Sequence, residues 1–231
     1  MSNTLGTHGR STLQRLLILT DRLDYAGGSR VILNLAPALC VRGFDLLIVS
    51  MSQSDPRISG ELPDSSRYLE LHPMRRSVAT TTLRRALIIW QMLKILRSFR
   101  PTVILSENLG AHRLLFLFAS VARRWRWVAR KGTLTLPTGN DAVRRRRRLS
   151  RLYRAVDHTV TPSTDAKSTI IEGLGVEPGK VSCIPNPLDI EDIRVKSRRL
   201  DVLELPEPSN RTADLRLVYV GRLISRKNVN I

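Results

Sequence analysis

The chain has 231 residues, of which 42% are hydrophobic, enough for one good-sized domain with a buried core or for one domain and part of a second. A formal net charge of +18 and a pI near 11.3 predict attraction to phosphate groups, an anionic membrane surface or nucleic acid. The only cysteines, Cys40 and Cys183, lie far apart without a metal-ligand neighbourhood, which argues against a disulfide framework or a zinc site and favours a reducing compartment.

No segment has the pattern of a signal peptide or a membrane span. The apolar run at 16–19 is too short for a signal-peptide core. The apolar stretch at 114–122 is much shorter than the roughly 20 residues that cross a bilayer. We therefore expect a cytoplasmic protein that does not span a membrane.

Short apolar runs alternate with segments of helical spacing along the chain. This alternation predicts an α/β fold, a Rossmann-like doubly wound parallel sheet with ligand sites at the carboxyl ends of its strands. The expected helices cover 28–43, 80–99, 109–123, 143–155 and 163–175. The expected strands are 16–20, 46–49, 67–71, 103–105, 127–129, 158–160 and 181–184.

A second domain is predicted to begin near the end of the chain. Residues 215–220 form another apolar run, and Gly221 follows it as a glycine follows the first strand. The segment before this run is charged, contains proline and lacks periodicity, as interdomain linkers do. The predicted organisation is a flexible amino terminus (1–14), a complete domain (15–193), a linker (194–213) and the start of a second domain (214–231).

Gly27 and Gly28 follow the first strand and open a helix. Their backbone N–H groups and the positive end of the helix dipole are suited to an anion such as phosphate, and a tight turn is an equally good interpretation. The three spaced glycines and the acidic residue of the dinucleotide-binding fingerprint are not recognisable.

Two further motifs lie after later strands. Arg222 and Lys227 are five positions apart beyond the run at 215–220, and an arginine fork with a lysine point charge can grip a diphosphate. Ordinary surface cations are the alternative interpretation. Between Pro185 and Pro187, Asn186 is displayed at a strand's carboxyl end, unless this segment is a simple loop before a short helix.

Together these motifs make the chain similar to the GT-B fold glycosyltransferases of family 4. The resemblance rests on residues 27–36, on 161–187 with the Asn186-Pro187 pair, and on 220–228 with Arg222 and Lys227, in the family's order and approximate spacing. It covers nearly the whole chain from Leu16.

The resemblance implies two Rossmann-like halves around a cleft, an amino-terminal half for the acceptor and a carboxyl-terminal half for a nucleotide-sugar donor. It implies that Arg222 and Lys227 hold the donor phosphates and that Gly27-Gly28 faces them from the opposite wall. The implied reaction is sugar transfer with retention at the anomeric carbon, with the nucleotide-sugar as co-substrate and no cofactor or obligatory metal. Cations offset the charge of the leaving diphosphate.

The chain departs from the family pattern at two places. It ends before the E-x7-E glutamate pair of the donor half, so we interpret it as a truncated member and expect no transfer above background from the purified chain. Where many members have a histidine after the strand at 127–129, this chain has Arg130-Lys131-Gly132, and neither His112 nor His158 takes that place. No catalytic residue is assigned.

Five consecutive arginines suggest a membrane contact, and the basic pairs Arg75-Arg76, Arg84-Arg85 and Arg123-Arg124 add to the positive charge. These residues, Arg144, Arg145, Arg146, Arg147 and Arg148, repel one another, so an anionic surface is the expected partner, and a solvated helix face is the simpler interpretation. The predicted helix at 80–99 carries Arg84-Arg85 and Trp90, and core packing is the favoured interpretation of Trp90.

The leading hypothesis is therefore a retaining glycosyltransferase, or its acceptor-binding half, that builds a cell-surface glycan or extends a lipid-linked acceptor at the inner face of the membrane. The alternative is an inactive remnant that binds an anionic lipid or glycan. Nucleic acid is not an expected partner, because its case rests on charge alone and aromatic residues for base stacking make up only 5% of the chain.

Overall fold

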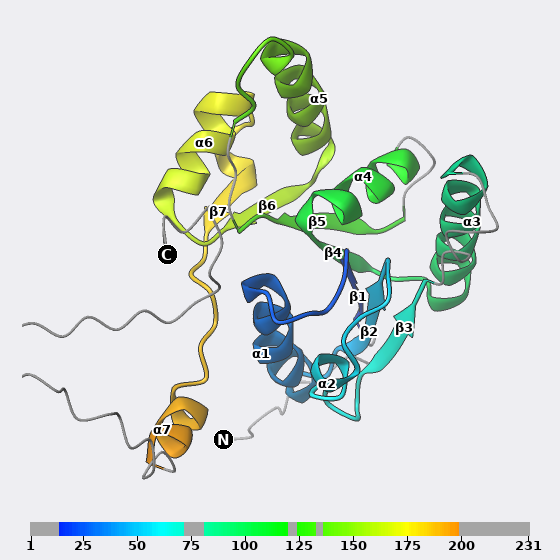
Figure 1. Cartoon of the computed structure of the whole chain (residues 1–231), viewed down its shortest axis with the longest axis vertical. Coiled ribbons are helices and arrows are strands. Elements are labelled where there is room, and N and C mark those ends of the chain that lie inside the picture. The colour runs from blue at the N-terminus through cyan, green and yellow to red at the C-terminus, as the bar shows by residue number, and fades with distance from the viewer. Residues whose placement is uncertain (1–13, 72–80, 120–123, 133–135, 199–231) are drawn as a thin grey trace, which may run out of the picture. The chain divides into compact units, whose positions relative to one another are not determined.

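A computed structural model describes residues 14–71, 81–119, 124–132 and 136–198. Its centre is a seven-stranded, fully parallel sheet with helices on both faces (Figure 1). All seven predicted strands and the α/β Rossmann-like fold class are confirmed. The strands are β1 (Arg15–Thr20), β2 (Asp45–Ser50), β3 (Arg67–Glu70), β4 (Val103–Glu107), β5 (Arg126–Arg130), β6 (His158–Thr161) and β7 (Val181–Cys183).

The five predicted helices are also present, with small differences at their ends. α4 ends at Phe118, before the expected end at Arg123, and residues 120–123 lie outside the described part. The short helix α2 was not predicted, although Asp55 caps it by accepting from the Arg57 N–H at 2.9 Å. The helices are α1 (Gly27–Val41), α2 (Pro56–Ser59), α3 (Thr81–Phe99), α4 (Asn108–Phe118), α5 (Ala142–Ala155) and α6 (Thr164–Leu174), with a 3₁₀ turn η1 (Pro178–Lys180) before β7.

The sheet changes its direction of growth between β1 and β4. The strand order is β3-β2-β1-β4-β5-β6-β7. β2 and β3 are therefore added on one side of β1, and β4 to β7 are added on its other side. Because crossover connections between parallel strands are right-handed, this reversal places the later helices on the opposite face from α1. Ligand sites of such folds lie at this reversal, outside the carboxyl ends of the strands.

Alternate residues of β1 pack into two separate cores. Leu17 and Leu19 belong to the core under α3, α4, α5 and α6, whereas Leu16 and Ile18 belong to the core under α1 and α2. A strand that is apolar on both faces has a continuous hydrophobic sequence, which is why these strands could be recognised without alternation.

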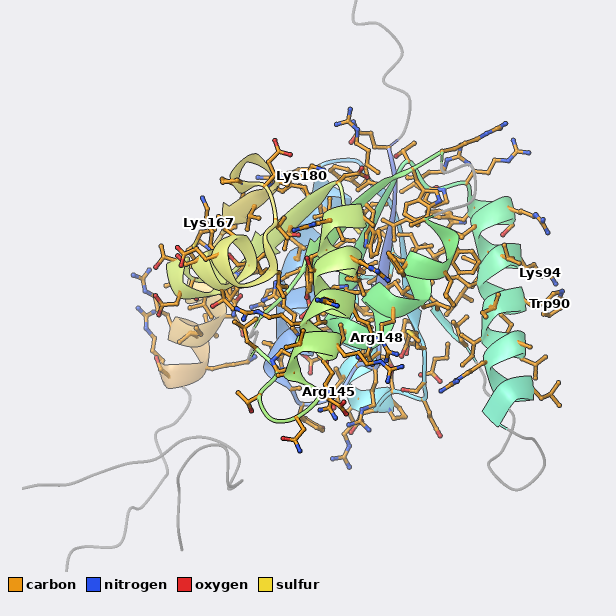
Figure 2. The ribbon with its side chains drawn as sticks, turned by 90° about the horizontal axis from the view of Figure 1, so that it is seen from above. Trp90, Lys94, Arg145, Arg148, Lys167 and Lys180 are labelled. Atoms are coloured by element: carbon orange, nitrogen blue, oxygen red, sulfur yellow. The ribbon has the colours of Figure 1, made fainter. Side chains whose placement is uncertain are left out.

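Trp90 does not pack against the sheet, so the favoured interpretation of this residue is wrong. Its side chain is 59% exposed, and the Lys94 Nζ lies 5.7 Å from the centre of its ring. Figure 2 shows both side chains projecting from α3. The helix buries Met92 instead. Met92 lies two residues after Trp90, a rotation of about 200° around the helix, so the two side chains are on opposite sides.

A separate compact unit begins at Ile190. Its described part is α7 (Ile190–Arg198), which has no buried residue and carries the ion pairs Arg194–Glu191 at 2.6 Å and Lys196–Asp192 at 2.7 Å. Residues 194–198 of the expected linker are therefore helical, and the strand expected at 215–220 lies outside the described part. The domain boundaries remain a prediction. None of the helices in the described part combines the length and apolar character needed to cross a bilayer.

A polar network is buried beneath α4. Ser106 Oγ accepts a hydrogen bond from Trp127 Nε1 at 2.8 Å and lies 2.7 Å from His112 Nδ1. The His112 ring meets the Tyr153 ring edge-on, with the centroids 5.7 Å apart. Both His112 and Trp127 are fully buried, so His112 lies within the core of the domain.

His112 should make the stability of the protein depend on pH. Burial lowers its pKa from the ordinary 6.5 to about 3, and the charge of Lys131 acts in the same direction. Between these values the unfolded chain binds a proton that the folded chain does not. The contribution of His112 is therefore present above pH 6.5 and is lost as the pH falls toward 3, by about 1.4 kcal/mol per pH unit.

Urea denaturation of wild type and His112→Gln across this range measures the effect. The difference between the two free energies of unfolding should shrink as the pH falls, because only the wild type carries this loss. An NMR titration of the wild-type ring gives an independent check, and a His112 pKa near 6.5 would contradict the buried neutral ring.

Candidate functional site

The loop from β1 to α1 presents Gly27 and Gly28 at the carboxyl edge of the sheet. Asp24 fixes the loop, because its Oδ1 accepts from the Ala26 N–H at 2.9 Å and its own N–H donates to Ser29 Oγ at 2.9 Å. Gly27 is exposed and Gly28 is half-buried at the first turn of α1. The predicted position of both glycines at a helix N-terminus is confirmed, and their phosphate-binding role remains a prediction.

A buried ion pair lies beside Gly28. The Arg130 Nη1 at the end of β5 donates to Glu107 Oε1 at the end of β4, at 2.6 Å, and the two side chains are 9% and 4% exposed. A Cβ atom added at Gly28 would come 3.1 Å from the same Glu107 oxygen. Gly28 therefore allows α1 to begin close to the charged ends of β4 and β5.

Asn186 completes this chain of contacts. Its Oδ1 accepts from the Arg130 Nη2 at 2.5 Å. The loop that carries it is tied to α1, because Asn34 Nδ2 donates to the Pro187 carbonyl at 2.9 Å. The loop after β7 thus lies against α1, the helix that Gly27 and Gly28 open. We define Gly28, Glu107, Arg130 and Asn186 as the edge cluster.

Asp21 and Lys131 extend the edge cluster. Asp21 Oδ1 accepts from the Ala111 N–H at 2.7 Å at the start of α4. Burial raises the pKa of Asp21 and of Glu107, and burial lowers the pKa of Lys131, while the two carboxylates act to raise the Lys131 pKa. These opposite charges lie close enough to interact, at the reversal between β1 and β4.

The turn into α4 has an unusual backbone. Asn108 directly follows β4 with φ at +71°, in the left-handed region that asparagine tolerates better than most residues. Residues with this conformation concentrate at functional sites. The turn places Glu107 against Arg130 and starts α4 beside Asp21.

Most of this cluster was not predicted from the sequence. Arg130 and Lys131 were noted there only as a departure from a family pattern, and Asp21 and Glu107 were given no role. Their positions in the sequence could have indicated a site, because Asp21, Glu107 and Arg130 each lie at or next to the carboxyl end of a buried strand.

The arginine run that was predicted as a membrane contact lies outside the edge cluster. Arg144 to Arg148 are all exposed on α5, and Arg146 donates to the Gly173 carbonyl at 2.7 Å. Arg222 and Lys227 lie outside the described residues, so the predicted crevice shared with Gly27 remains a prediction. Within the described part, no group of three or more His, Cys, Asp or Glu side chains is arranged to hold a metal ion.

Comparison with known proteins identifies a matching family. The model described as Glycosyltransferase Family 4 matches residues 25–192, well over half of the chain. Comparison with curated proteins gives no match.

Solved structures of glycosyltransferases share the fold. The apo lipopolysaccharide outer core galactosyltransferase WaaB is 13% identical, with a TM-score of 0.58 over 77% of this chain and 47% of its own. Anabaena Alr3699/HepE, solved with UDP and glucose, is 12% identical, with a TM-score of 0.60 over 81% and 50%. Sucrose-phosphate synthase from Thermosynechococcus elongatus is 12% identical, with a TM-score of 0.57 over 80% and 52%. These likenesses concern the fold alone, and the chain spans about half the length of each protein.

Gly28 and Gly27 provide a matched pair of substitutions. Gly28→Ala should lower the free energy of unfolding by about 1 kcal/mol relative to Gly27→Ala, because the new methyl group must displace the buried Glu107 carboxylate. Gly27 has no atom within 4 Å of such a methyl group, and alanine favours the helix there. Urea denaturation of both variants measures the difference. Equal stabilities would show that α1 does not begin against Glu107.

Proposed function

Because the chain belongs to glycosyltransferase family 4, we propose that it is the acceptor-binding half of a retaining glycosyltransferase. The enzyme would transfer a sugar from a nucleotide-sugar to a cell-surface glycan or a lipid-linked acceptor. The observation that carries this proposal is the edge cluster, which gathers the ends of β1, β4, β5 and β7 at the point where folds of this kind bind ligands.

The reaction needs positive charge near the leaving group. The acceptor hydroxyl oxygen forms a bond to the anomeric carbon, the bond from that carbon to the diphosphate oxygen breaks, the hydroxyl proton passes to the departing diphosphate or to solvent, and the diphosphate leaves as an anion. Lys131 and the N-terminus of α1 at Gly27-Gly28 are the groups of this half that would face the anion. Arg222 and Lys227 are the predicted groups of the other half.

A fusion protein tests the reaction class. Joining this chain to the carboxyl-terminal half of Alr3699/HepE, whose solved structure contains UDP and glucose, supplies a second half. We expect sugar transfer from a labelled UDP-sugar, with the anomeric configuration of the donor kept in the product. NMR coupling constants of the anomeric proton measure the configuration, and an inverted product would contradict the proposed mechanism.

Lys131→Ala in this fusion should lower the transfer rate by about tenfold or more, since one oriented charge commonly contributes that much to a transition state. Lys94→Ala, on α3 beside Trp90, removes the same charge outside the edge cluster and should leave the rate unchanged. Acceptor binding without any transfer would instead favour a non-catalytic binding module.

The basic face of α5 supports attachment to an anionic membrane. Its five consecutive arginines are exposed, and exposed cations contribute about 1 kcal/mol each near an anionic lipid surface. Peripheral attachment at the inner face of the membrane would bring the edge cluster to a lipid-linked acceptor.

Vesicle sedimentation tests the attachment. The chain should bind vesicles with about 30% anionic lipid, bind neutral vesicles weakly and dissociate as salt rises. Replacing Arg144 and Arg147 together by glutamine should reduce this binding. Equal binding to neutral and anionic vesicles would contradict an electrostatic contact.

A further inference from the structure

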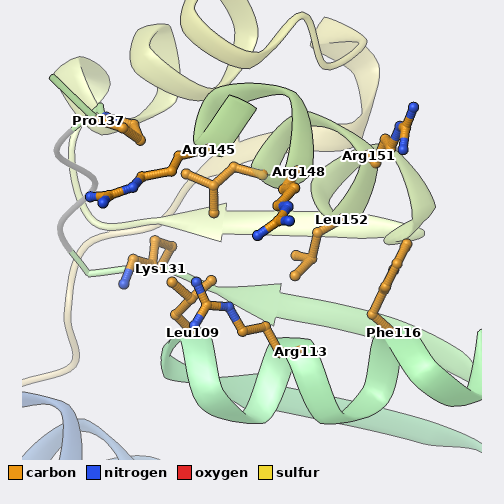
Figure 3. A pocket seen from close by; sticks show the side chains of 10 residues that line it. Leu109, Arg113, Phe116, Lys131, Pro137, Arg145, Arg148, Arg151 and Leu152 are labelled. Atoms are coloured by element: carbon orange, nitrogen blue, oxygen red, sulfur yellow. The ribbon is translucent and has the colours of Figure 1, made fainter. Parts of the chain in front are cut away.

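A pocket with a volume of about 740 Å³ lies between α4 and α5, next to the edge cluster (Figure 3). Lys131, which follows β5, lines the pocket and also interacts electrostatically with Glu107 and Asp21. The pocket therefore lies near the carboxylates of the site and is lined by residues of both helices. Neither the fold comparison nor the proposed reaction assigns it a ligand.

The charged lining of this pocket is entirely cationic. Its charged residues are Arg113, Lys131, Arg145, Arg148 and Arg151. Within the part of the chain that the structure describes, only Arg145 of the four arginines has an ion pair, a 3.8 Å contact with Asp141 in which both side chains are about two-thirds exposed. Figure 3 shows Arg113 and Arg148 pointing toward one another across the pocket. Such cations repel one another, and an anion between them would offset the repulsion.

The rest of the lining is mainly apolar. Leu149 and Leu152 of α5 are buried, and Phe116 of α4 is half-buried. Phe116 and Leu152 lie together at one end of the pocket, whereas Lys131 and Arg145 lie toward the other (Figure 3). A ligand that fits this lining has a charged head and an apolar body.

We propose that this pocket binds a lipid phosphate, with the phosphate or pyrophosphate among Lys131, Arg113 and Arg148 and the hydrocarbon chain along Phe116 and Leu152. Arginine forks suit phosphate oxygens, and burial of the chain supplies the hydrophobic contribution. The inference deepens the proposed function, on which it partly rests, because it identifies the lipid-linked acceptor as one whose lipid carries a phosphate, with that phosphate beside the edge cluster and a sugar hydroxyl of the acceptor left to react.

Calorimetric titration of the full chain with three soluble probes tests the ligand class. Farnesyl phosphate, used below its aggregation concentration, should bind at least about tenfold more tightly than farnesol or inorganic phosphate. If farnesol bound as tightly as farnesyl phosphate, the pocket would recognise only the hydrocarbon chain. If inorganic phosphate bound as tightly as farnesyl phosphate, the pocket would recognise only the anion. Either result would overturn the proposal.

Adjacent arginines on α5 give a matched control. Arg148 lines the pocket, whereas Arg147 is equally exposed and does not. Arg148→Ala should weaken farnesyl phosphate binding by about fivefold or more, and Arg147→Ala should change it by less than about twofold. Since both variants lose one charge, equal effects would indicate diffuse attraction to the basic surface and would overturn the proposed site.

A second matched pair examines the apolar end. Phe116→Ala should weaken the binding of farnesyl phosphate and leave that of inorganic phosphate unchanged, whereas Leu117→Ala, at an exposed position outside the pocket, should affect neither. Circular dichroism shows whether each variant is folded, and the two arginine variants decide the question should Phe116→Ala unfold.

The binding tests require no sugar donor, so their outcome is separate from that of the transfer assay. Transfer to a soluble glycan without farnesyl phosphate binding would keep the proposed function and overturn the lipid phosphate. Selective farnesyl phosphate binding without transfer would support the lipid phosphate pocket and overturn the proposed transferase function.

Discussion

The buried ion pair between Glu107 and Arg130 is the interaction on which the rest of the site depends. Both side chains are nearly excluded from solvent, so each charge has lost its hydration and needs the other. Removal of one partner from such a pair typically costs about 3–5 kcal/mol, because it leaves an uncompensated buried charge. The pair therefore holds the ends of β4 and β5 in one arrangement, and through Arg130 it also positions Asn186 after β7.

The ion pair also determines which residue can stand at the start of α1, where Gly28 lies beside Glu107. A Cβ atom at Gly28 would lie 3.1 Å from the Glu107 carboxylate, closer than ordinary van der Waals contact, so glycine lets α1 start close to the pair. Asn34 in the same helix then holds the loop after β7 by its contact with Pro187. Three hydrogen-bonded contacts and one close approach therefore join four chain segments: the end of β4, the end of β5, the loop after β7 and α1.

The charges of the protein are arranged in two ways. At the edge cluster, Asp21 and Glu107 balance Arg130 and Lys131, so the site is nearly neutral although the chain carries +18. Along α5 the five consecutive arginines are exposed, so their positive charge is available to an anionic partner. Lys131 interacts with the carboxylates of the edge cluster and also lines the pocket beside α5, which connects the proposed lipid phosphate pocket to the proposed site of transfer.

The sequence by itself determined the seven strands, the five long helices and the places of Gly27-Gly28 and Asn186 at strand ends, because buried parallel strands are continuously apolar and glycine and proline mark the turns between them. Only the tertiary structure decided which charged residues meet. Glu107 and Arg130 are 23 positions apart, and Arg130 and Asn186 are 56 apart, so their contacts follow from strand order and not from local pattern. The tertiary structure also decided that Trp90 is exposed. A helix with apolar residues on several sides does not reveal from its sequence which side packs against the sheet.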